Sequence, residues 1–231
     1  MSKFSTRFLV MTVMCAVCLI TSNMFVPRLW QLGNTSIQLS GAVLVFPISY
    51  IINDCLTEVY GYRKARLALW LTFSMSVFVA IMSALVSSLP DPIDKESAEM
   101  AVHFNALYML VPRTTIASLL AFILGSNLNA VIMSKMKVRS KGKHFGARAI
   151  LSSIGGEVLD SLVFFPIAYL GILSPKVLFS LFCTEVFVKT LYEILVLPLT
   201  TRIVKIIKKK EGIDTYDENI SYNLFNLKDI A

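Results

Sequence analysis

Charged residues recur at helical spacing inside two apolar stretches of the carboxyl-terminal half of this chain. Glu185, Lys189 and Glu193 follow one another at intervals of four residues, so they would line one face of a helix. Glu157 and Asp160 are three residues apart and would also share a face. Charges in a hydrocarbon region are costly and usually face a cavity, a partner or a substrate. We therefore predict a polar site inside a membrane.

An ion pair is the simplest role for Lys189, because pairing with Glu185 or Glu193 would fix the packing of its helix and do nothing more. Pairing does not account for the whole set, since the two stretches hold four acids against one base, or two bases once Arg113 is added. The surplus acids must be protonated, bind a cation or meet a substrate that carries hydrogen-bond donors. This balance favours transport or chemistry within the membrane.

A further polar cluster ends the second apolar stretch, where Asp54 and Glu58 are separated by one helical turn. Two roles stay open for this pair of acids. They could form an inner gate or proton relay, or they could be a helix-end cluster paired with Arg63 or Arg66. Amide side chains also fall within the apolar stretches, at Asn23, Asn53, Asn127 and Asn129.

The composition identifies the kind of element that must hold these residues. The chain has 231 residues, of which 55% are hydrophobic and 16% charged, with a mean hydropathy of +0.68. About a quarter of the residues of a soluble domain are charged. Aromatic residues in long apolar runs exclude a disordered chain, and four cysteines are too few for a disulfide scaffold. We predict an all-α integral membrane protein.

Six stretches approach the roughly 20 apolar residues that a helix needs to cross a bilayer. The first follows Lys3 and Arg7 like a signal peptide, but no cleavage site follows it, so it is expected to be retained. Pro112 should separate a short outer element from the fourth helix. The expected spans are residues 8–27, 37–54, 67–90, 112–134, 149–174 and 177–201, within a transmembrane domain of residues 1–210 that is followed by a cytoplasmic tail of residues 211–231.

The positions of Lys and Arg predict the orientation of this domain. Most lie in the amino-terminal segment, the second and fourth connections and the tail, whereas the opposite side has only Arg28, Lys95 and Lys176. The positive-inside rule then places both termini in the cytoplasm. The net charge of +7 suits anionic lipid headgroups, so lipid is an expected partner and nucleic acid is not.

The sequence contains few residues that are placed to act in enzyme catalysis. His103 and His144 both lie outside the expected spans, so no helical HExxH metal site can form. Cys15 and Cys18 form a C-x-x-C within an apolar span, where packing is the simpler role. Ser118 has no histidine base beside it. We expect no catalytic residue, no metal ligand and no cofactor.

One long segment resembles the signature of a known family. It runs from Phe46 to Tyr62, has the core D-x-x-T-E-x-Y-G and is followed by a basic cluster. This pattern is similar to the queuosine precursor transporter family, also called the vitamin uptake transporter family. The resemblance covers roughly residues 8–208. Further matching residues are Arg113, Ala117, Ser118, Asn129, Arg148, Ser152, Ser153, Asp160, Ser161, Phe164, Lys189 and Pro198.

The resemblance implies a six-helix inner-membrane importer of 7-deazaguanines such as preQ0, preQ1 or queuine, which are precursors of the modified tRNA base queuosine. The N1–H and exocyclic amine of such a base form a donor pair that Asp160 or Glu157 could accept as a fork. Its oxygen suits Lys189 or Arg113, and its flat face suits Phe164. The expected substrate-binding residues are Asn23, Tyr50, Asp54, Glu58, Arg113, Ser118, Asn127, Glu157, Asp160, Phe164, Lys189 and Glu193.

The identity of the precursor and the energy source stay open at this point. Glu157 stands where the family often has Gln, and a second acid there suits the amine of preQ1 or queuine. At the fold level, the family resembles the substrate-binding subunits of energy-coupling-factor transporters, which need ATPase partners. Those subunits often carry Ala-x-x-x-Ala on the first helix, but here Ile20 follows Ala16. A stand-alone carrier, proton-coupled or facilitated, is therefore expected, and an energising ATPase partner is not.

Three alternatives remain beside that expectation. The chain could be a substrate-binding subunit of an energy-coupling-factor vitamin transporter. It could be an intramembrane enzyme, although the missing bases and metal ligands disfavour this class. A homo-oligomer also stays open, because nothing in the residue pattern decides the number of copies.

Overall fold

The computed structural model describes residues 5–26, 28–31, 38–109, 111–171 and 173–226. Within these ranges the chain is almost entirely helical, with one small two-stranded sheet. The α-helices are α1 (Thr6–Phe25), α2 (Phe46–Tyr60), α3 (Tyr62–Ser87), α4 (Lys95–Met109), α5 (Val111–Arg139), α6 (Phe145–Tyr169) and α7 (Pro175–Glu211).

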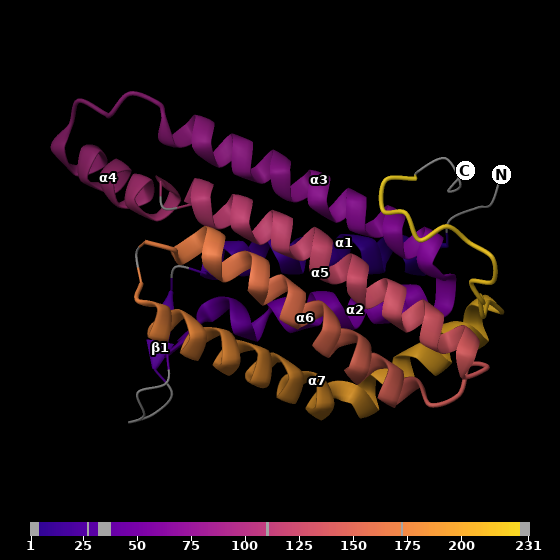
Figure 1. Ribbon diagram of the computed structural model, residues 1–231. Helices are drawn as coiled ribbons and strands as arrows, with labels where there is room; N and C mark the ends of the chain where they lie inside the picture. The colour runs from indigo at the N-terminus through magenta and orange to yellow at the C-terminus, as the bar shows by residue number, and fades with distance from the viewer. Residues whose placement is uncertain (1–4, 27, 32–37, 110, 172, 227–231) are drawn as a thin grey trace.

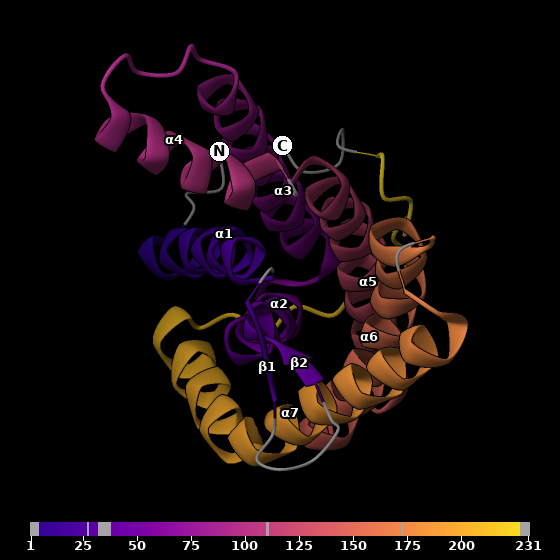
Figure 2. The same ribbon diagram turned by 90° about the vertical axis from the view of Figure 1, so that its left-hand side faces the viewer.

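The long helices run side by side along the molecule, as Figure 1 shows. Viewed from one end, α2 occupies the middle of the bundle, with α1, α3, α5, α6 and α7 around it (Figure 2). Of the 15 residues of α2, all but two are buried. Because α2 has neighbours on every side, its polar residues face other helices instead of lipid.

The outward faces of the bundle are apolar. The stripe Met75, Phe78 and Ile81 on α3 is exposed, whereas Thr72 and Ser76 on the same helix are buried. Apolar residues outside and polar residues inside is the arrangement that a bilayer favours. Five helical segments are long and apolar enough to cross a membrane, namely Thr6–Phe25, Gly41–Tyr60, Tyr62–Ser87, Ile116–Arg139 and Phe145–Tyr169.

The expected sixth span corresponds to α7, which differs from these five in its charges. It is 37 residues long, or about 55 Å at 1.5 Å per residue. Glu185, Lys189 and Glu193 interrupt its apolar sequence, but all three side chains are buried inside the bundle. The outer surface of α7 remains apolar at Phe187 and Leu195, which are 67% and 71% exposed.

The second expected span does not begin as an α-helix in its described part. Residues 38–40 form β2 (Gln38–Ser40), which pairs antiparallel with β1 (Leu29–Gln31) as the two strands of a hairpin, and a short 3-10 helix η1 (Gly41–Leu44) leads into α2. The Ser40 hydroxyl accepts a hydrogen bond from the Ala42 amide and donates one to the Val26 carbonyl, which holds the chain in this turn. We call this side of the molecule the hairpin end. The helix α2 itself runs on to Tyr60, six residues beyond the expected limit of residue 54.

Other expected boundaries shift by a few residues. The short element expected before Pro112 is the helix α4, and the fourth expected span corresponds to α5, which begins at Val111. The helices α1 and α6 begin and end earlier than the expected residues 8–27 and 149–174. Ser5 fixes the start of α1, because its hydroxyl accepts a hydrogen bond from the Phe8 amide. The helix α6 begins directly after His144, which has a left-handed backbone conformation.

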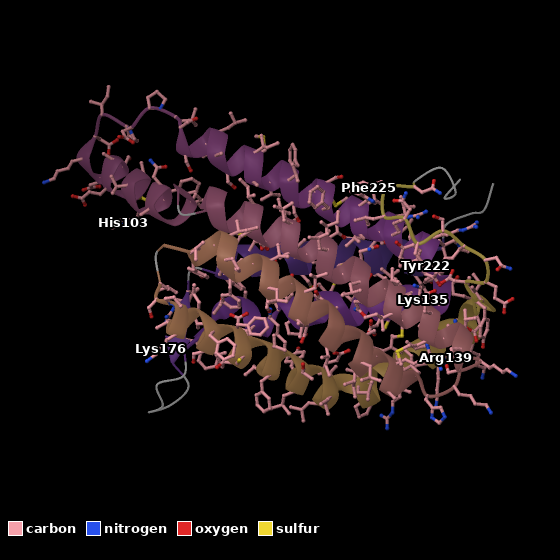
Figure 3. All side chains as sticks on the ribbon, in the orientation of Figure 1. His103, Lys135, Arg139, Lys176, Tyr222 and Phe225 are labelled. Carbon is pink, nitrogen blue, oxygen red and sulfur yellow. The ribbon has the colours of Figure 1, made fainter. Side chains whose placement is uncertain are left out.

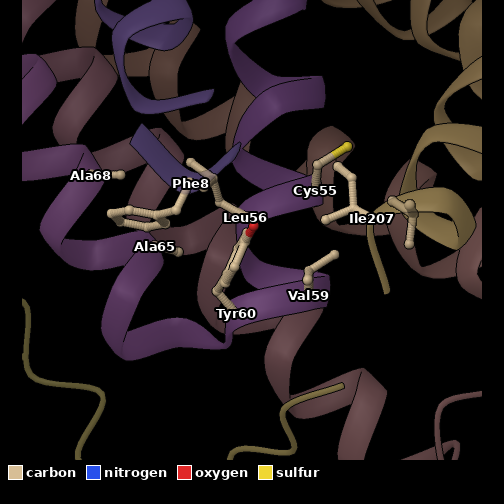
Figure 4. Packing of buried hydrophobic residues seen from close by; sticks show 9 residues of the cluster. Phe8, Cys55, Leu56, Val59, Tyr60, Ala65, Ala68 and Ile207 are labelled. Atoms are coloured by element: carbon tan, nitrogen blue, oxygen red, sulfur yellow. The ribbon is translucent and has the colours of Figure 1, made fainter. Parts of the chain in front are cut away.

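The opposite side of the bundle has a dense apolar core. Phe8 of α1 packs edge-to-face on Tyr60 of α2, with 5.4 Å between the ring centroids. The small residues Ala65 and Ala68 of α3 let α1 approach closely, and Ile207 of α7 completes the cluster (Figure 4). Four helices are therefore joined where the chain starts and where α7 ends.

Residues 212–226 fold back over this side of the bundle, which we call the tail end (Figure 1). The Asp217 carboxylate accepts hydrogen bonds from the Tyr62 amide at 2.8 Å and from the Ser134 hydroxyl at 2.6 Å. Trp70 donates to the Leu224 carbonyl at 2.9 Å. The expected tail is thus ordered and packed on α3 and α5. The start of α1 lies at the same end, where Arg7 forms an ion pair with Glu211.

Candidate functional site

The central helix α2 organises the polar interior. Phe46, Tyr50, Asp54 and Glu58 recur every four residues along its sequence, so they lie on one face and rise by about 6 Å per step. Phe46 lies toward the hairpin end and Glu58 toward the tail end. Each of these residues meets a different group of partners from α5, α6 and α7.

The group nearest the hairpin end is the Lys189 cluster, which consists of Asp160, Glu185 and Lys189. The Lys189 Nζ lies 3.2 Å from Glu185 Oε2 and 3.7 Å from Asp160 Oδ2. It also lies over the Phe46 ring, 4.6 Å from the centroid. Of the two partners expected for Lys189, the structure selects Glu185 over Glu193 and adds Asp160 from α6. One base faces two acids, so the cluster keeps an acceptor in excess.

A cavity of about 30 Å³ borders this cluster. On its other side, the Ser118 hydroxyl of α5 donates to the Asn23 side chain of α1. Carboxylates, an ammonium group, an amide, a hydroxyl and two aromatic rings thus converge on one space. The cavity is lined by Ser22, Asn23, Val26, Ser40, Ala42, Phe46, Ser118, Asp160, Phe164, Glu185 and Lys189.

The sequence prediction included most of the polar side chains of this cavity but omitted Phe46 and Glu185 from the expected binding residues. Phe46 lies one turn before Tyr50 on the same face of α2, so the four-residue spacing could have identified it. Glu185 was interpreted only as an ion-pair partner. Among the described residues, no group of three or more His, Cys, Asp and Glu side chains is arranged to hold a metal ion.

Below the cavity, Tyr50 lies against the crossing of α5 and α6. A Cβ atom on Gly125 would lie 2.5 Å from the Tyr50 hydroxyl and 2.7 Å from the Gly156 carbonyl. Two glycines are therefore needed for the two helices and the tyrosine ring to approach so closely. Next to this crossing, Glu157 accepts a hydrogen bond from the Thr190 hydroxyl at 3.2 Å.

The next step along α2 brings Asp54 to Glu193 of α7; we call these two residues the carboxyl pair. The Ser153 hydroxyl of α6 lies 2.7 Å from Glu193 Oε1 and 3.4 Å from Asp54 Oδ2. The Asn129 side chain faces Asp54 from α5. Within the described part of the chain, no salt bridge joins either carboxyl to a base.

The last step reaches the Glu58 network, which consists of Glu58, Lys137, Arg148, Lys208 and Asp214. Arg148 donates to both Glu58 oxygens, at 2.5 and 3.1 Å. Lys208 lies 2.5 Å from the same carboxylate, and Lys137 lies 3.8 Å from it. The expected pairing with Arg63 or Arg66 is wrong, because Lys137 of α5, Arg148 of α6 and Lys208 of α7 supply the bases. Both oxygens of Glu58 are occupied by these donors.

Asp214 in the tail closes this network. It accepts from Lys137 at 2.5 Å and lies 2.9 Å from Lys208. Burial alone would raise the pKa of Asp214, but the hydrogen bonds from the two lysines outweigh burial and hold this pKa below its usual value. Arg66, in turn, donates to the Asn223 carbonyl of the tail at 2.6 Å.

The expected binding residues therefore fall into three places. Two of them lie toward the tail end, since Glu58 is in its network and Asn127 accepts a hydrogen bond from the Tyr62 hydroxyl at 2.7 Å. The Arg113 side chain lies outside the described part of the chain. Those that border the cavity are Asn23, Ser118, Asp160, Phe164 and Lys189; those that lie between the cavity and the Glu58 network are Tyr50, Asp54, Glu157 and Glu193.

Comparison with known proteins places this architecture in a family. Residues 40–203 match the family model described as "putative vitamin uptake transporter". The chain is also 26% identical, over 164 residues, to the "probable queuosine precursor transporter" of Bacillus subtilis (strain 168), a match that covers 70% of each protein. No solved structure matches the chain. The matched segment contains α2, α3, α5, α6 and the part of α7 that holds the Lys189 cluster. This chain belongs to the vitamin uptake transporter family.

Proposed function

We propose that this protein imports queuosine precursors, 7-deazaguanine bases such as preQ0, preQ1 or queuine, across the inner membrane for tRNA modification. The observation that supports this proposal most is the Lys189 cluster, in which a buried ammonium and two carboxylates from two helices border a cavity with aromatic faces. The family and the name of the B. subtilis relative point in the same direction.

The chemistry of the cluster suits the edge of a 7-deazaguanine. Asp160 would accept the N1–H and the exocyclic amine as a fork. Lys189, released from Asp160, would donate to the carbonyl oxygen of the base and keep Glu185 as its ion-pair partner. Asp160 would exchange the Lys189 ammonium for the two hydrogen-bond donors of the base, so no buried charged group would be left without a hydrogen-bond partner.

The flat face of the base would lie between the aromatic side chains that border the cavity, Phe46 and Phe164. A space of about 30 Å³ admits water but not a bicyclic base. Binding must therefore widen the cavity. Ser40 of β2 and Ala42 of η1 lie in its lining, so displacement of β2 and η1 is the movement we propose for entry.

We also propose six crossings, with α7 as the sixth and both termini in the cytoplasm. The start of α1 and the tail share one end of the bundle, as an even number of crossings requires (Figure 1). Figure 3 shows Lys135 and Arg139 at that tail end and Lys176 at the opposite one, in keeping with the positive-inside bias. Glu185, Lys189 and Glu193, the charged residues in the middle of α7, are buried, so they present no charge to lipid.

An uptake assay tests the function and the site together. Cells that can neither make nor import precursors would express the protein, receive external preQ0 or preQ1 and be scored by queuosine in tRNA. We expect the wild type and Phe187→Ala, a change on the exposed face of α7, to restore queuosine. Asp160→Asn and Lys189→Ala should lower the uptake rate by about 30-fold or more, the loss expected for a charged hydrogen bond.

Two results would count against different parts of the proposal. If the wild type, present in the membrane, restores no queuosine, the proposed substrate class is wrong. If Asp160→Asn and Lys189→Ala both import normally at wild-type abundance, the transport function stands but the binding site lies elsewhere.

A further inference from the structure

The carboxyl pair is a deeply enclosed group of ionisable side chains in the part of the interior that the structure describes. Asp54 is fully buried and Glu193 is 3% exposed. They meet through Ser153, which is also fully buried. Each comes from a different helix, so α2, α6 and α7 converge on the pair.

The charged neighbours of the pair are occupied elsewhere. Lys189, one turn along α7 from Glu193, is held by Glu185 and Asp160. Arg148, on the tail side of Ser153, is held by Glu58. The groups that face the pair from its own and neighbouring helices are Tyr50, Cys55 and Glu58 on α2, Glu157 on α6 and Lys189 on α7.

The hydrogen bonds within the carboxyl pair do not satisfy all of its polar atoms. Ser153 has a single hydroxyl hydrogen for two carboxyl groups. Asp54 Oδ1, Glu193 Oε2 and both polar atoms of the buried Asn129 amide make no hydrogen bond of good geometry, although Asn129 and Glu193 both lie against the Asp54 carboxyl group. Buried polar atoms without partners are rare and call for an explanation. Here they come from α2, α5 and α7, so three helices bring them to one place in the interior.

Two carboxyl groups that share a donor in a medium of low dielectric constant cannot both be ionised at modest cost, so one proton is shared between them. We propose that the carboxyl pair is the coupling site of the transporter, which takes up one proton with each precursor molecule and releases it at the tail end. The cargo of this site is a proton, and the chemistry is its transfer onto and off one carboxylate oxygen.

The site is placed to link the two clusters beside it. Asp160 and Ser153 are on α6, and Lys189 and Glu193 are on α7, so any shift of these helices on precursor binding changes the spacing of the carboxyl pair. Glu157, whose carboxyl group accepts a hydrogen bond from Thr190 of α7, lies between Ser153 and Asp160 along α6. A proton from outside would neutralise the carboxyl pair while precursor is bound. Release of that proton toward the tail end would restore the negative charge of the pair. This inference rests on the proposed transport of a deazaguanine.

Purified protein in liposomes provides the test. With the membrane potential clamped at zero, one proton per preQ0 predicts about tenfold accumulation for a gradient of one pH unit, acid outside. A pH dye inside the liposomes would report proton entry with preQ0. Asp54→Asn and Glu193→Gln should abolish accumulation and proton entry, and the exchange of labelled for unlabelled preQ0 should fall less in these two variants than in Asp160→Asn. Asp160→Asn should lose exchange as well.

The outcomes separate the two proposals. Wild type that neither exchanges nor accumulates preQ0 contradicts the proposed function. Wild type that exchanges preQ0 but does not accumulate it on a pH gradient, or accumulates it only on a sodium gradient, contradicts the coupling proposal alone. So does an Asp54→Asn variant that still accumulates preQ0 with proton entry.

Infrared spectroscopy covers the case in which an Asp54 or Glu193 variant does not fold. The carbonyl band of a protonated carboxyl group should be present in the wild type at neutral pH. It should shift in Ser153→Ala, which removes only the shared hydroxyl. A band that is unchanged in Ser153→Ala, together with proton-coupled accumulation at the wild-type level in that variant, would show that the shared proton is elsewhere.

Discussion

The Lys189 cluster and the Glu58 network contain the same kinds of side chain, but their balance differs. In the network at the tail end, three bases fill both oxygens of Glu58, and two of these bases also hold one oxygen of Asp214. In the cluster, one base faces two acids beside a cavity. A network whose donors and acceptors are matched holds helices together, whereas a cluster with an acceptor in excess has something left for a ligand.

The two regions also differ in how far apart their members lie in sequence. Lys189 and Glu185 are four residues apart on one helix. Glu58 meets Arg148 and Lys208 at sequence separations of 90 and 150 residues. The network therefore fixes the tertiary arrangement of α2, α6 and α7, and the cluster uses an arrangement that is already fixed.

The largest effect should come from breaking the network. Glu58→Gln leaves three bases without their shared carboxylate, and removal of one partner from a buried ion pair costs about 3–5 kcal/mol. We expect a large loss of folded protein, measured by thermal unfolding in detergent. Asp160→Asn should cost much less, because Lys189 keeps Glu185. Equal stability of the two variants would remove the distinction between the regions.

The crossing between the two regions should be the next most sensitive. Gly156→Ala would place a Cβ 2.8 Å from the Gly125 carbonyl and from the Tyr50 ring, and overpacking of this kind costs about 1–3 kcal/mol. Gly155→Ala is the matched control, because its Cβ would meet only the flexible end of Ile132. The same unfolding assay compares them. If both variants are equally stable, close approach of α5 and α6 is not what positions Tyr50.

A smaller effect should fall on selectivity within the site. Glu157 has one oxygen bonded to Thr190 and one without a partner, so it can accept the amine that preQ1 carries and preQ0 lacks. Glu157→Gln should weaken the binding of preQ1 about tenfold relative to the binding of preQ0, which corresponds to about 1.4 kcal/mol of binding free energy. Competition of the two precursors for uptake measures this ratio. An unchanged ratio would place the amine elsewhere.

These contrasts show what the sequence could and could not predict. The four-residue spacing of Glu185, Lys189 and Glu193 correctly indicated a buried polar face, because helical periodicity is a local property. The partner of Lys189 on α6 depends on how two helices rotate against each other, which no local pattern reveals. For the same reason Arg148 was not recognised as the partner of Glu58, although both lie within the resemblance.

The hairpin and the tail show a second kind of limit. Residues 38–40 were expected to lie within a span, but they form β2, and the Ser40 side-chain hydrogen bonds and the close approach of Gly41 to the Phe25 carbonyl turn the chain before α2. The tail was expected only to follow the last helix. Its attachment through Asp217 and Leu224 depends on partners more than 80 residues away.

The smallest effect should be the pH dependence of the tail contact. The pKa of Asp214 is lowered in the folded protein, so its contribution to stability is present above the unfolded pKa of about 3.9 and is lost as the pH falls through the folded value. The wild type should exceed Asp214→Asn in stability at neutral pH, and the difference should vanish in strong acid. A difference that is constant with pH would show that the charge of Asp214 does not act there.

Ligand binding to the purified protein tests whether the Lys189 cluster recognises a deazaguanine. Thermal stabilisation would be measured with preQ0, preQ1, queuine and guanine, on the wild type and on Asp160→Asn. We expect a deazaguanine, and not guanine, to stabilise the wild type, and we expect Asp160→Asn to bind the deazaguanine about 30-fold more weakly. A wild type that no deazaguanine stabilises, or an Asp160→Asn variant that binds as tightly as the wild type, would contradict it.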